Sequence, residues 1–385
     1  MKKISIEQRK YDARMAISAR QGRVKNKKRK AKKNSLCSWR GTNNWIDCNT
    51  EKGLNIDIIG SNKVILTLPK VMNFSSAYEE TSLHLLAIRK LAKRQGTSPN
   101  AYKLETVRFE NLERISTSAA LVLTAELSKW DDHIRRNLRP MTENWNEEIY
   151  HRLHDLGFFD LFRKKPGSQP PAKERTSKIS LVKYIKGKCG DNAKAVELKN
   201  KIIEIVGEEI TKWTFLYCGL SEAITNVSHH AYPPTKNYSE SEKNWYLSAS
   251  YNTETHELKV VFYDQGIGIP QSLPASKVWE KALEFLSRFA PIAGKKDEAL
   301  LRAAVELDRT STEQTDRGKG LQDLLEFIKQ RKMGYLSILS MKGLYKFSIE
   351  NNKTSIKTES FSNPIHGTLI IWKVTLTPQS IEGAS

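Results

Sequence analysis

Cysteine is scarce in this 385-residue sequence, and long apolar runs are missing. Its four cysteines have no CxxC spacing, which excludes a disulfide scaffold and argues against a zinc site. The most apolar stretches, such as 116–125, fall well short of the roughly 18 residues that a membrane-spanning helix needs. The first residues are basic, with no apolar segment behind them, so a secretory signal is not expected. These absences predict a cytoplasmic protein that does not enter a membrane.

Positive charge is concentrated at the start of the chain. The sequence has a formal net charge of +20, and residues 1–35 hold 14 of its 63 Lys and Arg side chains with only two acids. The run at 25–33 repels itself and cannot bury apolar surface, which predicts a basic disordered tail over residues 1–35. Such a tail either binds nucleic-acid phosphates or an acidic partner in a salt-dependent way, or only keeps the protein in solution.

Apolar periodicity after the tail predicts a small α/β domain over residues 36–163. The expected strands are 63–68 and 104–109, and the expected helices are 76–93, 118–130 and 147–161, the last with a break near Gly157. The segment 164–177 replaces this periodicity with proline, glycine and charge, which is typical of a linker.

Residues 178–385 predict a second domain, in which helices precede consecutive strands. This order is typical of helices packed on one face of a mostly antiparallel sheet. The expected helices are 193–206, 208–232 and 321–332, and the expected strands are 179–185, 258–263, 334–340, 346–349 and 367–376. The fold class predicted for the whole chain is therefore α/β with two domains.

A polar stripe marks the helix predicted at 208–232. Glu222, Asn226 and His230 are spaced four residues apart in SEAITNVSHHAY, so they share one helix face. An asparagine amide oxygen is a neutral ligand that suits Mg²⁺, and a carboxylate one turn away can polarise a water or hydroxyl for attack. The same spacing is also typical of an ordinary solvated helix face, so this motif is weak alone.

The second motif, DQGIGIP, begins at Asp264 directly after the predicted strand LKVVFY. An aspartate at the end of a buried strand can accept a hydrogen bond from an exocyclic amine. Gly266 and Gly268 allow the backbone to turn sharply and to approach a ligand closely. An ordinary strand-to-loop turn has the same composition, so this motif too is weak by itself.

Two further motifs follow towards the C-terminus. DRGKGL, at 316–321, opens a predicted helix, and N–H groups at a glycine-rich helix start form a phosphate cradle to which Lys319 adds charge. Gly367 and Thr368 begin the last predicted strand, where the threonine hydroxyl is placed for a contact with a base or a water.

Together and in this order, the four motifs resemble the ATP-binding domain of the GHKL superfamily, which includes gyrase, histidine kinases and MutL. The resemblance covers about residues 178–377. SEAITNVSHHAY resembles the asparagine box of anti-sigma-factor serine kinases, and DQGIGIP resembles the first glycine box of the superfamily. The resemblance implies an α/β sandwich that binds ATP and Mg²⁺.

The resemblance also implies roles for individual residues. Glu222 is the expected general base or water polariser, Asn226 the expected Mg²⁺ ligand and Asp264 the expected adenine acceptor. The other expected nucleotide-binding residues are His230, Gly266, Gly268, Ile269, Arg317, Gly318, Lys319, Gly320, Leu321 and Thr368.

Two features depart from the superfamily pattern. The second glycine box reads GKGLQDL, without the further glycine often found after the leucine. The segment between the boxes, 271–315, is long, with helical stretches expected at 275–289 and 296–307. This segment is either an ATP lid, with Arg309 and the hydroxyls at 310–312 as candidate phosphate contacts, or an insertion that packs on the sheet.

The first domain resembles a STAS domain, the anti-sigma-antagonist fold, over about residues 53–163, and the segments 104–130 and 147–162 carry the resemblance. In that family the strand-to-helix turn carries a phosphorylated Ser or Thr, commonly after an Asp, and here Ser116 stands in place of the acid. Thr117 and Ser118 are candidate phosphoacceptors, but these residue types also make good helix N-caps, and we favour the capping interpretation.

These resemblances predict an enzyme with a regulatory role, an ATPase or a serine/threonine-kinase-like phosphotransferase, with a protein partner or substrate. Two alternatives stay open. One is a non-catalytic ATP-gated switch that hides or displays the STAS-like surface. The other is a nucleic-acid-associated ATPase, in which the tail at 1–35 grips phosphates and ATP closes a homodimer.

Overall fold

The computed structural model describes residues 39–92, 98–130, 140–164, 166, 178–236, 238–240, 242–275, 279–287, 296–308 and 321–376. The tail predicted at 1–35 and most of the predicted linker lie outside the described residues. The chain is mixed α/β, as predicted, and its contacts form two compact units, residues 1–67 with 87–108 and residues 68–86 with 109–385. Within the described ranges, no helix is both long and apolar enough to cross a bilayer.

The smaller unit contains a helix over residues 39–50 and a three-stranded sheet. Strand β1 (Ile56–Ile59) pairs antiparallel with β2 (Lys63–Thr67), and β2 pairs parallel with β4 (Lys103–Arg108). The last residues of helix α2 (Tyr78–Ala92) belong to the same unit, and Lys90 Nζ lies 5.1 Å from the centre of the Trp45 ring.

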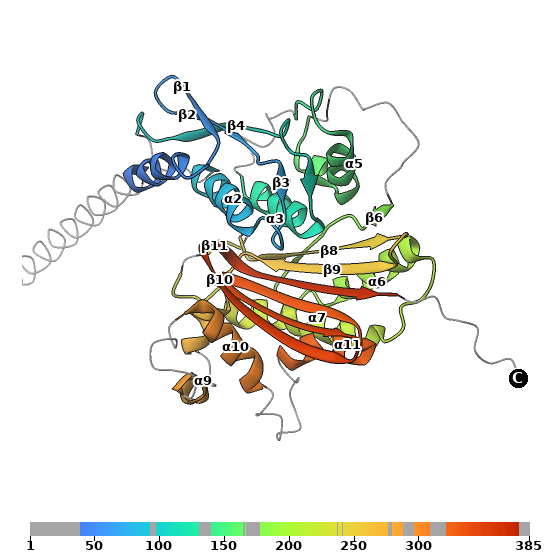
Figure 1. Cartoon of the computed structure of the whole chain (residues 1–385). Coiled ribbons are helices and arrows are strands. Elements are labelled where there is room, and N and C mark those ends of the chain that lie inside the picture. The colour runs from blue at the N-terminus through green and yellow to red at the C-terminus, as the bar shows by residue number, and fades with distance from the viewer. Residues whose placement is uncertain are drawn as a thin grey trace, which may run out of the picture. The chain divides into compact units, whose positions relative to one another are not determined.

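A six-stranded antiparallel sheet forms the centre of the larger unit (Figure 1). Its strand order is β10-β11-β9-β8-β6, and β7 also pairs with β8. The strands are β6 (Ile179–Leu181), β7 (Ile185–Lys188), β8 (Asn244–Asn252), β9 (Glu257–Asp264), β10 (Gly334–Glu350) and β11 (Lys353–Thr375).

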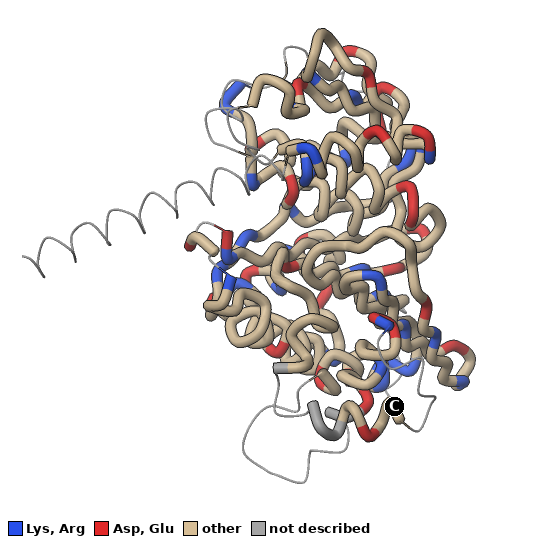
Figure 2. The backbone as a smooth tube through the Cα atoms, turned by 90° about the vertical axis from the view of Figure 1, so that its left-hand side faces the viewer, with Lys and Arg blue, Asp and Glu red and all other residues tan. Residues whose placement is uncertain are grey.

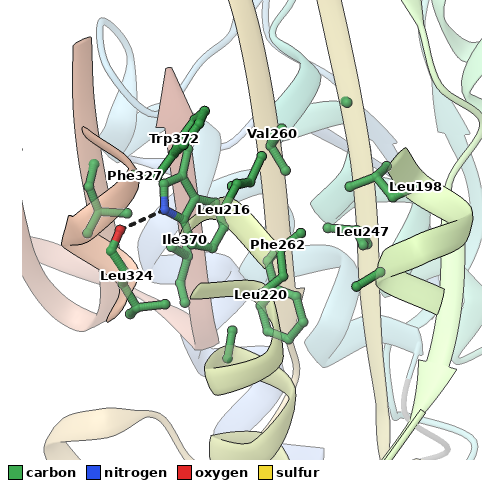
Figure 3. Close-up of a cluster of buried hydrophobic side chains, with 14 of the residues drawn as sticks. Leu198, Leu216, Leu220, Leu247, Val260, Phe262, Leu324, Phe327, Ile370 and Trp372 are labelled. Atoms are coloured by element: carbon green, nitrogen blue, oxygen red, sulfur yellow. Dashed lines mark hydrogen bonds between the residues drawn. The ribbon is translucent and has the colours of Figure 1, made fainter. Parts of the chain in front are cut away.

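Three helices cover one face of this sheet: α6 (Ala193–Val206), α7 (Trp213–Asn226) and α11 (Leu321–Arg331). Alternate residues of the strands, such as Leu247 and Phe262, pack with leucines of the helices to form the main core (Figure 3). Trp372 lies fully inside it and donates a 2.8 Å hydrogen bond from its indole N–H to the Leu324 carbonyl. This arrangement of helices on a mostly antiparallel sheet is the one that the sequence predicted for the second domain.

Helix α3 (Thr117–Ser128) packs against β8 and β9 within the same unit. Its sequence, TSAALVLTAELS, is apolar on almost every side, and all of its residues are buried, which is typical of a helix that is covered all round. The Thr117 hydroxyl donates to Ser250 Oγ at 2.9 Å, and Ser128 Oγ lies 2.5 Å from the Tyr246 hydroxyl. The compact units therefore differ from the predicted domains, because a helix of this composition needs the cover that the sheet supplies.

Short elements surround the start of α3. Strand β3 (Val71–Met72) pairs parallel with β5 (Arg114–Ile115). Helix α5 (Glu147–Leu156) ends at Gly157, which has a φ of 87°, and is followed by a short 3-10 helix, Phe158–Leu161. The break predicted near Gly157 is confirmed.

Strands β10 and β11 form a hairpin that is longer than the sequence predicted. The strands predicted separately at 334–340 and 346–349 are one strand with a register shift after Ser340, and β11 begins 14 residues before the predicted start at Gly367. The turn residues Asn351 and Asn352 both have positive φ values, 50° and 60°, which suits a two-residue hairpin turn. The residues near the turn are mostly exposed, so they show no apolar alternation from which a strand is recognised.

The segment between the two glycine motifs folds as short helices with a small core of their own. They are α8 (Ile269–Ser272), a 3-10 turn (Leu273–Ala275), α9 (Trp279–Ser287) and α10 (Asp297–Asp308). Leu286 and Leu300 are buried in this core, and Asp297 accepts a 2.9 Å hydrogen bond from the backbone N–H of Lys342 on β10. The two predicted helical stretches are confirmed, and α10 packs on the sheet. Arg309 and the hydroxyls at 310–312 lie outside the described residues.

Charge is mixed along the described chain. Figure 2 shows the Lys and Arg positions interspersed with the Asp and Glu positions. Several of these charges form exposed ion pairs, such as Lys178 with Glu254 and Lys183 with Asp160. Pairs of this kind contribute little to stability, so the fold depends mainly on the buried apolar layers.

Candidate functional site

Asp264 is the last residue of β9 and lies on the sheet face that carries the main core. Its register partner on β11 is Thr368, so the two side chains share that face. Only 4% of Asp264 is exposed. Burial raises the pKa of its carboxyl group to about 6, although hydrogen bonds from the Gly266 N–H, at 2.8 Å, and from Thr368 act in the opposite direction. A buried carboxylate with these neighbours is suited to a further hydrogen-bond donor.

The loop after Asp264 needs both of its glycines. A Cβ atom at Gly266 would lie 2.5 Å from the Ala231 carbonyl oxygen. Gly268 has φ 83° and ψ 155°, a conformation essentially restricted to glycine, and a Cβ atom there would lie 2.7 Å from Ser340 Oγ. The sequence predicted that these glycines allow a close approach to a ligand; in the structure each of them closely approaches another part of this chain.

Ser340 ties this loop to the last two strands. Its hydroxyl accepts a 3.0 Å hydrogen bond from the Ile269 N–H and donates one of 2.8 Å to the Gly367 carbonyl. It also lies 3.3 Å from Thr368 Oγ1 and is fully buried. Ser340 was not among the residues predicted from the sequence, although a serine at the end of the apolar strand YLSILS was a signal that could have found it.

Asn226 and Glu222 contact each other at the end of α7. Asn226 Nδ2 donates a 2.9 Å hydrogen bond to Glu222 Oε1, so the amide nitrogen is engaged and the amide oxygen is left as an acceptor. Both side chains are half-buried. Their predicted position on one helix face is confirmed by this contact.

The helix changes its geometry directly after Asn226. Residues Val227–Ala231 form a single π-helical turn, a feature that often occurs at functional sites. His230 lies within this turn, where partial burial and the neighbouring His229 lower the pKa of its ring. The regular helix predicted over 208–232 is therefore wrong at both ends, since α7 begins only at Trp213, after Lys212 with φ 65°.

The π-helical turn joins the asparagine motif to the glycine loop. The Ile267 N–H donates a 2.9 Å hydrogen bond to the Ala231 carbonyl. The Tyr232 hydroxyl accepts from the Gln265 N–H at 3.3 Å and donates to the Asn244 carbonyl at 2.6 Å. Burial, followed by the charge of Asp264, raises the pKa of Tyr232. The structure thus brings the segment that ends at Asn226 together with the segment that begins at Asp264.

The neighbours of Asp264 in the chain face the opposite side of the sheet and contact α3. Glu126 Oε1 accepts a 3.0 Å hydrogen bond from the Tyr263 hydroxyl and another of 3.0 Å from Gln265 Nε2. Only 4% of Glu126 is exposed. Glu126 was not among the residues predicted from the sequence, although a lone acid in the apolar helix AALVLTAEL was the available signal.

The turn before α3 is capped differently from the prediction. Ser116, rather than Thr117 or Ser118, is the N-cap, and its hydroxyl accepts from the Ala119 N–H at 3.2 Å. Thr117 and Ser118 are 6% and 4% exposed, so neither hydroxyl is open to a kinase in this conformation. A hydroxyl side chain of this turn therefore caps the helix, as predicted, but it belongs to Ser116 and not to Thr117 or Ser118.

The phosphate side of the predicted site is not described. Arg317, Gly318, Lys319 and Gly320 lie outside the described residues, and Leu321, the first residue of α11, is partly buried against the core. Glu222, Asn226, His230, Asp264, Gly266, Gly268, Ile269 and Thr368 are all placed, in the larger unit.

The donor set at the end of α7 fits a magnesium ion that is held mainly by its nucleotide. Within the described ranges, no group of three or more His, Cys, Asp or Glu side chains is arranged to hold a metal ion. Mg²⁺ commonly takes only one or two protein oxygens and completes its shell with water and substrate phosphates. The Asn226 amide oxygen, next to the Glu222 carboxylate, offers this kind of site.

No protein-family model matches this chain, and no curated protein matches it.

Proposed function

We propose that the larger unit binds ATP together with Mg²⁺, and that the protein uses this nucleotide in regulation, by hydrolysing it or by transferring its γ-phosphate to a protein hydroxyl. The proposal follows from the GHKL resemblance of the four motifs. The observation that carries it is the position of Asp264, which is buried at the end of β9, opposite Thr368, and is followed by a loop docked on the helix that bears Asn226.

Different side chains of this protein have different roles in holding such a ligand. The Asp264 carboxylate accepts the exocyclic amine of adenine, and the Thr368 hydroxyl beside it steadies that carboxylate. The Asn226 amide oxygen offers a neutral ligand to Mg²⁺, which would neutralise phosphate charge when bound. Glu222 holds the Asn226 amide in place and is the group nearest to it that can take a proton from water or a hydroxyl.

Nucleotide affinity tests this proposal through two single substitutions. Asp264→Asn places an amide against the adenine amine, and we expect it to weaken binding of both ATP and adenosine at least tenfold in calorimetric titrations. Asn226→Ala removes only the metal ligand, so ATP affinity should fall in the presence of Mg²⁺ and stay unchanged with EDTA. Asp160→Asn, at an exposed aspartate, is the matched control. Equal Mg²⁺-ATP affinity in all four proteins contradicts the proposal.

The fate of the γ-phosphate distinguishes the modes of action. With ATP labelled at that phosphate, label on a protein indicates phosphotransfer, and free phosphate indicates hydrolysis. Intact bound ATP indicates a switch. In either catalytic mode, Glu222→Gln should abolish product formation while leaving ATP bound, because the amide keeps an oxygen for Asn226 but takes up no proton.

One observation favours the switch as a second candidate. Glu126 of α3 bonds to both chain neighbours of Asp264, so a shift of Asp264 on nucleotide binding would move the partners of Glu126. A nucleotide-dependent change in the amide exchange of residues 117–128, measured with unhydrolysed ATP, supports this mode. Identical exchange with and without nucleotide speaks against it.

A further inference from the structure

A cavity of about 310 Å³ lies where the start of α3 meets the sheet, and every residue that lines it belongs to the larger unit. Strands β3 and β5, helix α5 and the neighbouring ends of β8 and β9 all contribute to its walls. Its volume is at the lower end of the range for small-molecule sites. The cavity combines charged side chains with an apolar part that includes Val71, Met72 and Ile179.

Three cations line this cavity, and among the described residues two of them form no close ion pair. Arg152 donates to Glu148 Oε1 at 2.6 Å and to the Ile115 carbonyl at 2.8 Å, while its buried Nε has no hydrogen-bond partner. Arg114 and Lys259 form no ion pair with any residue that the structure describes. Glu257, which also lines the cavity, is paired with Lys373. Against the three cations the walls carry only two acids, Glu148 and Glu257, so the lining has an excess of positive charge, although Glu257 also raises the pKa of Lys259.

The position of Lys259 is unfavourable without an anion. Its register partner on β11 is Lys373, so two like charges lie directly opposite each other on adjacent strands. Burial, and next the charge of Lys373, lowers the pKa of Lys259. An anion in the cavity would relieve both effects.

This cavity is separate from the proposed nucleotide site. Side chains alternate between the two faces of a strand, so Lys259 and Asp264, five residues apart on the regular strand β9, lie on opposite faces of the sheet. Along the strand they are separated by roughly 17 Å. The main core and the sheet itself lie between the two sites.

We propose that this cavity binds a small phosphomonoester, with the dianionic phosphate between Arg114 and Lys259 and the carbon part against Val71 and Met72. A doubly charged phosphate suits a lining with an excess of positive charge, and an arginine provides the forked donors that suit phosphate oxygens. Ser116, the N-cap residue of α3, also lines the cavity and adds a hydroxyl group to its wall. The ligand would thus bridge α3, β5 and β9.

Equilibrium dialysis of the full chain tests this inference, with labelled inorganic phosphate as the first probe and phenyl phosphate as competitor. We expect saturable binding of one phosphate per chain, and tighter binding of phenyl phosphate because its ring reaches the apolar part. Lys259→Met and Arg114→Gln should each weaken phosphate binding at least tenfold. Lys342→Met, at an exposed lysine on β10, should leave it unchanged.

A further variant separates this site from the nucleotide site. Asp264→Asn should keep phosphate binding even where it loses ATP, so failure of one proposal does not imply failure of the other. Circular dichroism checks that Lys259→Met is folded, which we expect because the substitution removes a like-charge pair. Phosphate binding that does not saturate, or that is equal in wild type, Lys259→Met and Arg114→Gln, overturns the inference.

Discussion

Gln265 Nε2 donates a 3.0 Å hydrogen bond to Glu126 Oε1, so the residue next to Asp264 in the chain is held by helix α3. The two residues are 139 positions apart in the sequence and lie on the far side of the sheet from Asp264. The same carboxylate accepts from Tyr263, the residue before Asp264. A buried acid of α3 therefore fixes the strand end on which the candidate site depends.

Glu126→Gln should destabilise the fold, because a neutral amide oxygen is a weaker acceptor than a carboxylate for the two donors, Tyr263 and Gln265. We expect a loss of about 1–3 kcal/mol in the free energy of unfolding, measured by urea denaturation. Glu143→Gln, at an exposed position, serves as the control. Similar urea midpoints for the two variants would show that the Glu126 contacts contribute nothing.

The stability of the protein should carry a pH signature from Asp264. Its pKa is about 6 in the folded chain against an ordinary value of 3.8, so between these values the folded state holds a proton that the unfolded state has released. The stability due to this group is thus greatest at low pH and falls by about 3 kcal/mol as pH rises towards 6.

Asp264→Asn removes this dependence. We expect the variant to gain stability relative to wild type between pH 4 and pH 6, and the difference to stay constant above pH 7. Urea midpoints measured at half-unit pH intervals check this. A difference that is the same at every pH would mean that Asp264 titrates as an ordinary carboxyl group.

Gly266→Ala should push the glycine loop away from the π-helical turn. The added Cβ atom would meet backbone as well as side-chain atoms of Ala231, which cannot yield without moving the helix end. We expect a destabilisation of about 1–3 kcal/mol and weaker nucleotide binding. Gly41→Ala, where no atom lies within 4 Å of the new Cβ, should be neutral or slightly stabilising. If Gly266→Ala left the nucleotide affinity unchanged, the glycine loop would not contribute to nucleotide binding.

The long hairpin is held at its side by the first turn of α2. Glu79 accepts hydrogen bonds from the backbone N–H groups of Ser362, at 2.6 Å, and Asn363, at 3.0 Å, and the Tyr78 ring stacks on Phe361 at 3.6 Å. We expect Glu79→Ala to speed amide hydrogen exchange at Ser362 and Asn363 by at least tenfold. Glu80→Ala, one residue along, should leave both rates as they are. Equal rates in the two variants would show that Glu79 does not protect these amides.

Local patterns predicted the elements that have an apolar face or a strong end signal. LKVVFY predicted β9, and Gly157 predicted the end of α5, because each depends on residues that are close together in the sequence. The pairing of Glu222 with Asn226 was predictable for the same reason, since one helical turn brings them together.

These local patterns do not predict contacts between segments that are far apart in the sequence. Ser340 and Glu126 acquire their roles only when strands and helices far apart in the chain meet at Asp264. The outer part of β11 was missed because most of its residues are exposed, and the π-helical turn because the regular helical period continues through it in the sequence.

The contacts of helix α3 limit where the chain can be cut into stable fragments. A fragment that starts at residue 178 would leave Tyr246 and Tyr263 without their partners on α3 and would expose an apolar sheet face to water, so it should precipitate when expressed alone. A cut at another position does not separate the two units, because residues 87–108 of the smaller unit lie between two segments of the larger one in the sequence. No single cleavage therefore releases one unit from the other. A protease that cuts between residues 164 and 178 should therefore yield two pieces that migrate together on a sizing column.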